Sequence, residues 1–308
     1  MTTREGMPVR PRILVVGEAI TAFMHYATDA PLAFHGPFPS GAPVIFASAA
    51  ARLGAHVELA AGVGEDIFGS QLRERLASHG VSNRSLVVDP AVPTATVFVS
   101  YEAGGGRSFL FYLKGTAALS VEAGALDRAG AADWLHVSGA TLWFGGQTAS
   151  TAWLAVERAF AAGTRISFDP NVRAAVLPAE TRRKFDILLG AASVVLVSAG
   201  ELEAVGGSEA AILERGAAVC YKVGVAGAIV ATATGRWSVP APVVVEVDPD
   251  GAGDIFAAGY VVAAALGAEP QDCARVGVAV ASASVEVQGP LESKILPIEA
   301  YLDRTERT

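Results

Sequence analysis

The sequence contains few cysteines, few charged residues and few aromatic residues for its 308 positions. The two cysteines, Cys220 and Cys273, lack both C-x-x-C spacing and the density of a disulfide scaffold, so we expect them to be reduced and buried. Charged residues make up only 18% of the chain and hydrophobic residues 52%, which excludes a disordered or fibrous protein. We therefore expect one main globular domain over residues 1–308, built around a large buried sheet.

Clustered positive charge and long apolar runs are also missing. The chain has 23 Lys and Arg against 31 Asp and Glu, with no basic stripe, so we expect no nucleic-acid partner. The most apolar stretch, 255–268, is rich in Ala and Gly and too short to span a bilayer, which predicts a core helix and no membrane partner. Residues 1–11 lack the apolar region and cleavage site of a signal peptide, so we expect a cytoplasmic protein.

The signature motifs of several common enzyme classes are absent. No G-x-x-x-x-G-K-[ST] occurs, so a P-loop enzyme is not expected, and Gly62 and Gly64 lack the third glycine of a dinucleotide-binding loop. G-x-S-x-G and H-E-x-x-H are missing as well, which argues against a serine hydrolase and a zinc protease. The chemistry must therefore lie in another pattern.

The first half of the chain shows two kinds of periodicity. Apolar runs and small-residue stretches predict strands at 13–17 and 57–61 and helices at 42–53 and 68–78. Polar and apolar residues then alternate over 96–102 and 107–112 on either side of three glycines, which is typical of an antiparallel hairpin. Segment 19–38 carries strand-forming residues with interspersed Pro and Gly. We assign both regions, about 19–38 and 95–113, to a small β appendage.

From residue 134 onward strands and helices alternate in a βαβ series, which is typical of a parallel sheet. The pattern predicts strands at 134–137, 165–168, 194–197, 218–222, 228–232 and 243–246, and helices at 148–162, 178–189, from near 253 to before 270, and about 272–287. No internal repeat or low-complexity linker is present. The expected fold class is therefore α/β.

Segment 247–259 joins a turn to an apolar helix and carries the most informative pattern. Gly251 and Gly253, with Ala252 between them, allow backbone N–H groups to converge where the helix dipole is positive, which suits a transferring phosphate. Asp254 at the same helix start would repel phosphate unless it takes the proton of an incoming hydroxyl, as a general base does in phosphoryl transfer. By local physics alone, an Asp that caps a tight turn is an equal alternative.

This segment resembles the second signature of the PfkB, or ribokinase-like, carbohydrate kinases, D-x-x-G-A-G-D-x-F. The matching residues are Asp248, Gly251, Ala252, Gly253, Asp254 and Phe256. Seven further segments resemble family landmarks, in the same order along the chain: 40–43, 51–54, 62–69, 136–139, 169–173, 198–201 (with Ser198 in place of the usual Asn) and 222–227. The resemblance therefore extends over nearly the whole chain.

The resemblance implies a ribokinase-like three-layer α/β/α fold with a mostly parallel central sheet and a small β-sheet lid, which the predicted hairpin supplies. It implies ATP and Mg²⁺ as cofactors, leaves a monovalent-cation requirement open and favours a homodimer, because lid-to-lid dimers are common among relatives. The nucleotide-side residues would be Ser198, Glu201, Lys222, Gly224 and Gly227, and the metal would be held through water by Glu201 and Asp169. A first-turn Glu that only supports its helix is the alternative for Glu201.

The acceptor that the resemblance implies is a small sugar or sugar acid. Arg173 follows a predicted strand end, where open α/β sheets bind ligands, so we favour a site role over that of a surface cation. Lys114-Gly-Thr-Ala117 resembles the 2-keto-3-deoxygluconate kinase branch, which favours a sugar acid. The expected substrate-side residues are Gly41, Phe111, Tyr112, Lys114, Asp169, Asn171 and Arg173. Core packing is the alternative for the two aromatic residues.

Three positions depart from the family pattern on the acceptor side. Ala22 stands where many members have Asp, Ile45 where they have Asn, and Leu113 where the sugar-acid branch has Arg. Hydrocarbon thus replaces groups that bind hydroxyls or a carboxylate, while the phosphate side is retained. We expect a working phosphotransferase with an atypical or less hydroxylated acceptor; a nucleoside kinase and a catalytically silent sugar- or nucleotide-binding regulator are the alternatives.

Overall fold

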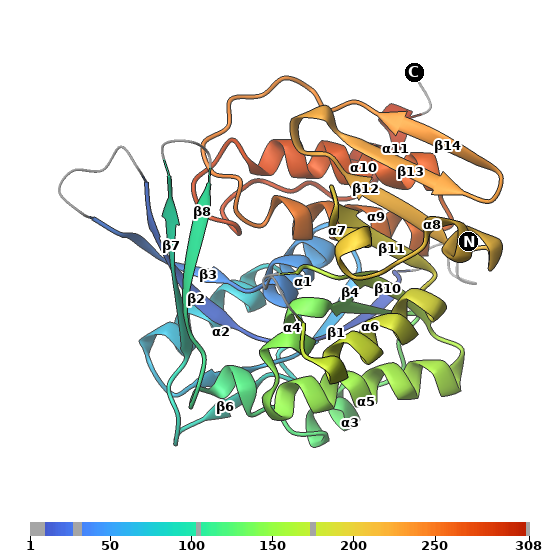
Figure 1. Cartoon of the computed structure of the whole chain (residues 1–308). Helices are drawn as coiled ribbons and strands as arrows, with labels where there is room; N and C mark the ends of the chain where they lie inside the picture. Colours follow the sequence, from blue (N-terminus) through green and yellow to red (C-terminus); the bar gives the residue numbers. More distant parts are fainter. Residues whose placement is uncertain (1–9, 27–32, 103–105, 173–176, 306–308) are drawn as a thin grey trace, which may run out of the picture.

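The central feature of the fold is an eight-stranded sheet of order β14-β13-β12-β11-β10-β9-β1-β4 (Figure 1). The computed structural model describes residues 10–26, 33–102, 106–172 and 177–305. The six strands from β12 to β4 run parallel, and β13 and β14 form an antiparallel edge. The strands are β1 Arg12–Val16, β4 His56–Ala60, β9 Trp134–Ser138, β10 Arg165–Asp169, β11 Val194–Ser198, β12 Ala218–Lys222, β13 Ala228–Thr232 and β14 Gly235–Val239.

Helices cover both faces of this sheet, because its inner strands are apolar on both sides. Phe46, Leu72 and Val261 belong to the apolar cluster on one face, whereas Val156 and Phe185 belong to that on the other. The first cluster takes in α1 Ala42–Arg52, α2 Ile67–Ser78, α9 Ala252–Ala265, α10 Pro270–Ser284 and α11 Glu299–Thr305. The second takes in α3 Gly124–Ala129, α4 Gly139–Phe144, α5 Gly146–Ala162, α6 Ala179–Ala191, α7 Glu201–Ala204 and α8 Glu209–Glu214. The result is a three-layer α/β/α arrangement.

A second sheet of order β3-β2-β7-β8 stands beside the first, at the left of Figure 1. Its strands are β2 Ile20–His25, β3 His35–Ser40, β7 Ala95–Tyr101 and β8 Arg107–Tyr112, and we call it the lid. The predicted hairpin is confirmed, since β7 and β8 pair antiparallel from Thr96↔Tyr112 to Tyr101↔Arg107. Segment 19–38 supplies β2 and β3, of which β2 pairs parallel to β7.

The lid has two different faces, because side chains alternate along each strand. Ile20, Val97 and Val99 lie on the face turned toward the main body, together with Phe109 and Phe111 of β8. The opposite face carries Phe23, Phe98, Leu110 and Tyr112, of which Leu110 and Tyr112 are each 55% exposed. One face of the lid therefore covers a cavity and the other presents aromatic residues to solvent.

The sequence expectations for the C-terminal half need two corrections. The predicted strand 243–246 is wrong: these residues form no strand, and the outer edge position belongs to Gly235–Val239. The last long helix begins at Pro270 and ends at Ser284, earlier than predicted. The apolar stretch near 255–268 is a core helix as expected, since residues 254–263 are buried. Over the described ranges, no helix combines the length and apolarity needed to cross a membrane.

Smaller elements complete the chain and lie close to the two sheets. Gly62–Gly64 and Val87–Asp89 pair in parallel as β5 and β6. Two short 3₁₀ turns are η1 Ala117–Leu119 and η2 Gly224–Ala226. The second of these follows β12 directly and borders the groove described next.

Candidate active site

The loop before helix α9 ends at Gly251, which shapes the start of that helix. Gly251 has a φ of 75°, and a Cβ atom there would lie 2.9 Å from Pro290 and 3.0 Å from Ile45, so a larger residue does not fit without movement. The N–H groups of Gly253 and Asp254 lie in the first turn of α9, where the helix dipole adds positive potential. This geometry suits a bound anion.

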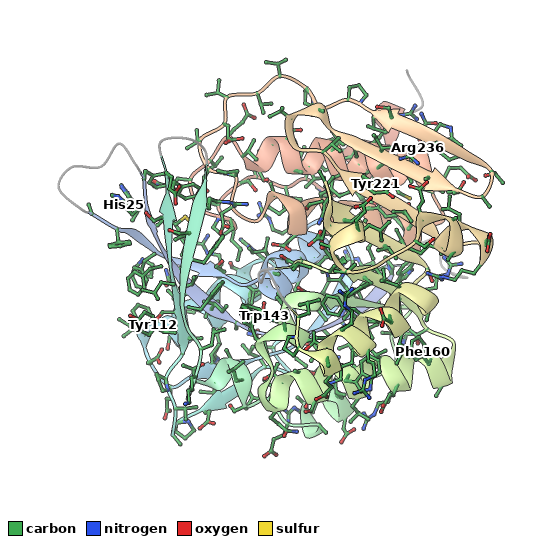
Figure 2. All side chains as sticks on the ribbon, viewed as in Figure 1. His25, Tyr112, Trp143, Phe160, Tyr221 and Arg236 are labelled. Atoms are coloured by element: carbon green, nitrogen blue, oxygen red, sulfur yellow. The ribbon has the colours of Figure 1, made fainter. Side chains whose placement is uncertain are left out.

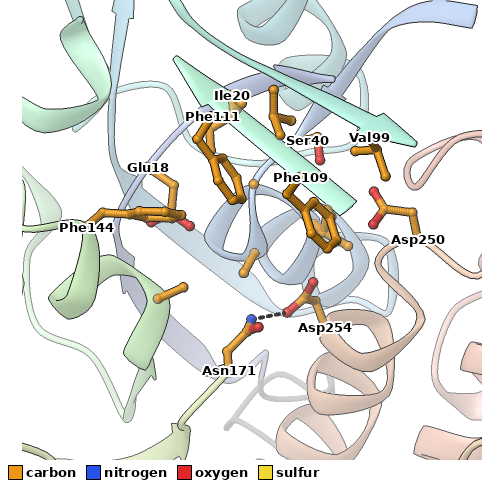
Figure 3. A pocket seen from close by; sticks show the side chains of 15 residues that line it. Glu18, Ile20, Ser40, Val99, Phe109, Phe111, Phe144, Asn171, Asp250 and Asp254 are labelled. Atoms are coloured by element: carbon orange, nitrogen blue, oxygen red, sulfur yellow. Dashed lines mark hydrogen bonds between the residues drawn. The ribbon is translucent and has the colours of Figure 1, made fainter. Parts of the chain in front are cut away.

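Asp254 holds its carboxylate at the same helix start, and only 8% of the residue is exposed. The Nδ2 group of Asn171 donates a hydrogen bond to Asp254 Oδ1 at 3.3 Å, as Figure 3 shows. Asn171 has a φ of 44° and its own N–H donates to Asp169 Oδ1 at 3.2 Å. Strained backbone of this kind is typical of functional sites, and here it aims an amide at the carboxylate of Asp254.

A buried lysine lies beside these carboxylates at the end of β12. Lys222 Nζ donates to Asp169 Oδ2 at 2.5 Å, and both side chains are largely shielded from solvent. Burial alone would lower the pKa of Lys222, but the charges of Asp169, Glu201 and Asp254 outweigh it and raise that pKa. Lys222 is therefore a fixed positive charge in the site at neutral pH.

Glu201 begins α7 and ties together two loops at the ends of neighbouring strands. Its carboxylate accepts hydrogen bonds from the backbone N–H of Val172 at 2.7 Å and of Ser198 at 2.8 Å. Within the described ranges no three His, Cys, Asp or Glu side chains are grouped to hold a metal directly. Mg²⁺ keeps most of its waters and is commonly bound by phosphates with one or two carboxylates. Glu201 and Asp169 therefore fit such an ion through water.

These groups line one large groove with a volume of about 1140 Å³. Every nucleotide-side and catalytic residue expected from the sequence lines it: Ser198, Glu201, Lys222, Gly224, Gly227, Gly251, Ala252, Gly253 and Asp254. Its apolar wall comes from the coil 241–244 and from Val278 and Val285 of the α10 region. The groove thus has a charged end at the α9 start and an apolar end, which suits an anionic ligand with a flat apolar part.

A second cavity, of about 50 Å³, lies between the lid and the main body, and we call it the acceptor pocket. Asn171, Asp250 and Asp254 line both the groove and this pocket, so the two cavities meet at the α9 start. The remaining lining residues are Glu18, Ile20, Ser40, Gly41, Ala42, Ile45, Val97, Val99, Phe109, Phe111, Ala140 and Phe144 (Figure 3). Most of this wall is hydrocarbon.

The residues expected on the substrate side fall into different places. Gly41 and Phe111 line the acceptor pocket, whereas Asp169 lines only the groove. Tyr112 points to the outer face of the lid, as Figure 2 shows, and the exposed Lys114 is not among the pocket residues either. Arg173 lies outside the described residues.

The pocket also contains residues that the sequence analysis missed. Glu18 follows β1 and is 2% exposed, and its Oε2 accepts a hydrogen bond from Thr141 at 2.6 Å. Its position just after a parallel strand is the signal that would have identified it. Phe109 lies two residues before Phe111 on the same strand, so alternation would have placed it on the same face.

The three departures from the family pattern occupy distinct positions. Ile45 lines the acceptor pocket directly, on the first turn of α1. Ala22 and Leu113 are buried in the apolar cluster of the lid and are not pocket residues. Only the change at Ile45 therefore alters the described wall of the pocket.

The profile of the family described as pfkB family carbohydrate kinase matches residues 11–296 of the chain. The chain is 32% identical over 306 residues to the 2-dehydro-3-deoxygluconokinase of Thermoproteus tenax, covering 94% of this chain and 92% of that protein. It is 34% identical over 247 residues to the fructokinase of Klebsiella pneumoniae, covering 77% and 80% of the two chains.

Solved structures agree with this match. A putative ribokinase II from E. coli in complex with ATP and Mg²⁺ superposes with a TM-score of 0.84 at 30% identity, over 97% of this chain and all of that one. The fructokinase of Vibrio cholerae O395, bound to fructose, ADP and calcium, superposes with a TM-score of 0.82 at 27% identity, over 96% and 98%. The ribokinase-like α/β fold with a small second sheet is thereby confirmed.

Proposed function

Because the chain belongs to the pfkB family of carbohydrate kinases, we propose that it transfers the γ-phosphoryl group of ATP to a hydroxyl of a small sugar, with Asp254 as general base. Membership of the family and carbohydrate kinase activity, both expected from the sequence, are confirmed by the comparisons. The observation that supports the role of Asp254 is its position: its carboxylate lies where the groove and the acceptor pocket meet.

The proposed reaction uses groups on both sides of this junction. The acceptor hydroxyl gives its proton to Asp254 while its oxygen forms a bond to the γ-phosphorus, and the bond from that phosphorus to the bridging oxygen breaks to release ADP. The N–H groups of Gly251 and Gly253 and the ammonium group of Lys222 balance the negative charge on the moving phosphoryl group, whereas the N–H group of Ala252 donates to Pro249 O at 3.3 Å within the loop. Asn171 orients the base through the hydrogen bond to Asp254 Oδ1.

We propose Mg²⁺ as the metal of the reaction, near Glu201 and Asp169 through water. When bound, it would neutralise charge on the ATP phosphates. A monovalent cation is not assigned a place.

For the acceptor we propose a neutral sugar rather than a sugar acid. The described wall of the pocket carries the carboxylates of Glu18, Asp250 and Asp254 and no Lys or Arg side chain. A further carboxylate would be repelled there, whereas a hydroxyl can donate a hydrogen bond to Glu18. Phe109 and Phe111 offer an apolar surface to the carbon-bound face of a sugar ring.

The experiment is an ATP-consumption screen with D-fructose, other neutral sugars, sugar acids and nucleosides, followed by mass spectrometry of the product. We expect phosphorylation of a neutral sugar, and a fall in kcat on the order of 10²- to 10⁴-fold for Asp254→Asn with ATP affinity nearly unchanged. Asp186→Asn, an isosteric change on the exposed side of α6, is the matched control. Wild-type turnover by Asp254→Asn would disprove the base assignment, and phosphorylation of nucleosides alone would favour a nucleoside kinase.

We further propose that the enzyme is a cytoplasmic homodimer whose subunits meet through the outer faces of their lids. Leu110 and Tyr112 are exposed there, and burying such side chains stabilises an interface. The free and buried Cys220 and Cys273 suit a reducing compartment. Sedimentation of Leu110→Glu tests the dimer: we expect monomers for the variant and dimers for the wild type, and equal masses would contradict it.

A further inference from the structure

Asp248 is the first residue of the signature loop, and its carboxylate accepts hydrogen bonds from the lid as well as from the loop. Its Oδ1 accepts hydrogen bonds from the hydroxyl of Tyr101 at 2.7 Å and from the N–H of Asp250 at 3.0 Å. Its Oδ2 accepts from the hydroxyl of Tyr26 at 3.0 Å and from the N–H of Gly289 at 2.9 Å. The residue is only 2% exposed. Four donors therefore hold one buried carboxylate, and two of them come from lid strands.

The pairing of the lid strands explains why two tyrosines reach the same carboxylate. β2 and β7 pair in parallel up to His25↔Ser100, so Tyr26 and Tyr101 are the next residues on each strand. Their rings stack with centroids 5.0 Å apart and planes within 3°. Burial and the nearby carboxylates raise the pKa of both tyrosines, so each hydroxyl keeps its proton and donates.

A third contact joins the same loop to the neighbouring lid strand. Arg107 on β8 pairs with Tyr101 across the hairpin, and its guanidinium lies 3.6 Å from Asp250. Three adjacent strands thus contact residues 248–250, which lead directly into Gly251 and the start of α9. We call the set Tyr26, Tyr101, Arg107, Asp248 and Asp250 the lid latch.

With the latch formed, the acceptor pocket is narrow, with a volume of about 50 Å³. Strands of the lid form part of its wall, so raising the lid would widen the pocket for an acceptor. Because Ile20, Val97 and Phe109 form the pocket wall on the same strands, lifting the lid far enough also separates the tyrosines from Asp248.

We propose that Tyr26 and Tyr101 are positioning residues that couple lid closure to the shape of the loop preceding Asp254. When the lid closes over an acceptor, the two hydroxyls engage Asp248 and fix the loop from which the anion-binding N–H groups extend. When the lid is open, that loop loses two of the hydrogen bonds on its first carboxylate. This inference rests on the proposed function and adds to it a link between the two cavities.

The test is hydrogen exchange measured by mass spectrometry on the full chain, without ligands and with ATP and Mg²⁺. Tyr26→Phe and Tyr101→Phe keep the stacked rings and remove one hydroxyl each. We expect exchange in peptides from the lid and in those covering 248–256 to accelerate together, by roughly tenfold per lost hydrogen bond to the carboxylate. Tyr221→Phe, which loses a hydroxyl-carboxylate hydrogen bond to Glu209 away from the lid, is the matched control and should leave both regions unchanged.

The outcomes separate coupling from simple support of the lid. Faster exchange confined to the lid, with 248–256 unaffected, would overturn the proposal, as would two variants that exchange like the wild type. In kinetics with D-fructose, we expect the Michaelis constant for the sugar to rise about tenfold while that for ATP stays within twofold. Absence of phosphorylation by the wild type would count against the proposed acceptor class, whereas hydrogen exchange still decides the coupling. Asp248→Asn should reproduce the exchange pattern of Tyr101→Phe.

Discussion

The nucleotide groove and the acceptor pocket meet at Asp254 but are built differently. The groove is large, its charged end combines backbone N–H groups with Lys222, and its shape follows from strand ends and helix starts of the main sheet. The pocket is small and mostly hydrocarbon, and six of its fifteen lining residues belong to lid strands. Because backbone groups form the phosphate site, that site suits the same phosphoryl donor whatever the acceptor is. A wall of separate side chains permits the acceptor to change without disturbing the donor side.

The largest effect should come from Gly251→Ala, which changes the backbone where the two cavities meet. The added Cβ would meet Pro290 and Ile45 in a φ region that alanine avoids, so the amides and Asp254 would shift together. We expect kcat to fall on the order of 10³-fold, because both charge stabilisation and base position are lost. Gly190→Ala is the control, since a Cβ atom added at Gly190 of α6 would have no neighbouring atom within 4 Å. Steady-state kinetics of a folded variant with near-normal kcat would contradict the account.

Lys222→Met changes only the groove. The ammonium group of Lys222 faces Asp169 and is the buried positive charge of the donor side. We expect kcat/KM for ATP to fall on the order of 10²-fold, and stability to drop by about 3 kcal/mol because Asp169 is left buried without its partner. Lys184→Met, which removes a pair with the exposed Glu180, should change neither quantity appreciably. Equal losses in both variants would show that the site does not depend on this charge.

The pocket alone is addressed by Ile45→Asn. The amide would offer a hydrogen bond to an acceptor hydroxyl where the wild type has a branched hydrocarbon. We expect the preference for D-fructose over its deoxy analogues, measured as the ratio of kcat/KM values, to rise by about tenfold with ATP kinetics unchanged. Ile45→Val keeps a hydrocarbon at that position and should preserve the wild-type ratio. A changed Michaelis constant for ATP would show that the two cavities are not separable.

The last prediction concerns stability at acidic pH and does not involve activity at neutral pH. His136 on β9 is buried and stacks on Phe46, with ring centroids 3.7 Å apart. Burial, with the charge of Lys222, lowers the pKa of His136 to about 3. Since this pKa lies below the unfolded value near 6.5, protonation favours unfolding. The contribution of His136 to stability is thus complete above pH 6.5 and falls by about 1.4 kcal/mol per pH unit as the pH drops from 6.5 to about 3. His136→Gln should flatten that slope in urea unfolding, unlike the exposed control His56→Gln. An unchanged slope would contradict the assignment.

The sequence predicted the groove far better than the pocket, for a physical reason. Gly251, Lys222 and Glu201 lie at turns, strand ends and helix starts, which local patterns reveal. Which of Phe111 and Tyr112 faces inward depends on the pairing of β8, because neighbouring residues of a strand point to opposite faces. The sequence assigned both to the substrate, and the structure places only Phe111 on the pocket wall.

Two other differences have the same origin in long-range contacts. Val243 and Val245 are β-branched residues typical of a strand, but both are exposed, Val243 fully and Val245 largely. Neither pairs with a strand in the described structure, because β14 pairs with β13 instead. Tyr26 and Tyr101 lie far apart in the chain, and only the parallel pairing of their strands brings both to Asp248. Neither outcome can be read from local periodicity.

The parallel pairing of β2 and β7 also constrains how the chain folds. Ile20 pairs with Ala95, 75 positions later, and the intervening residues include α1, β4 and α2 of the main body. Closing so long a loop costs entropy that local contacts of the lid cannot repay on their own. The lid should therefore assemble only after the first strands and helices of the main sheet have condensed. An isolated lid fragment would not fold, and in the intact chain the lid over the acceptor pocket forms only because the main sheet has folded first.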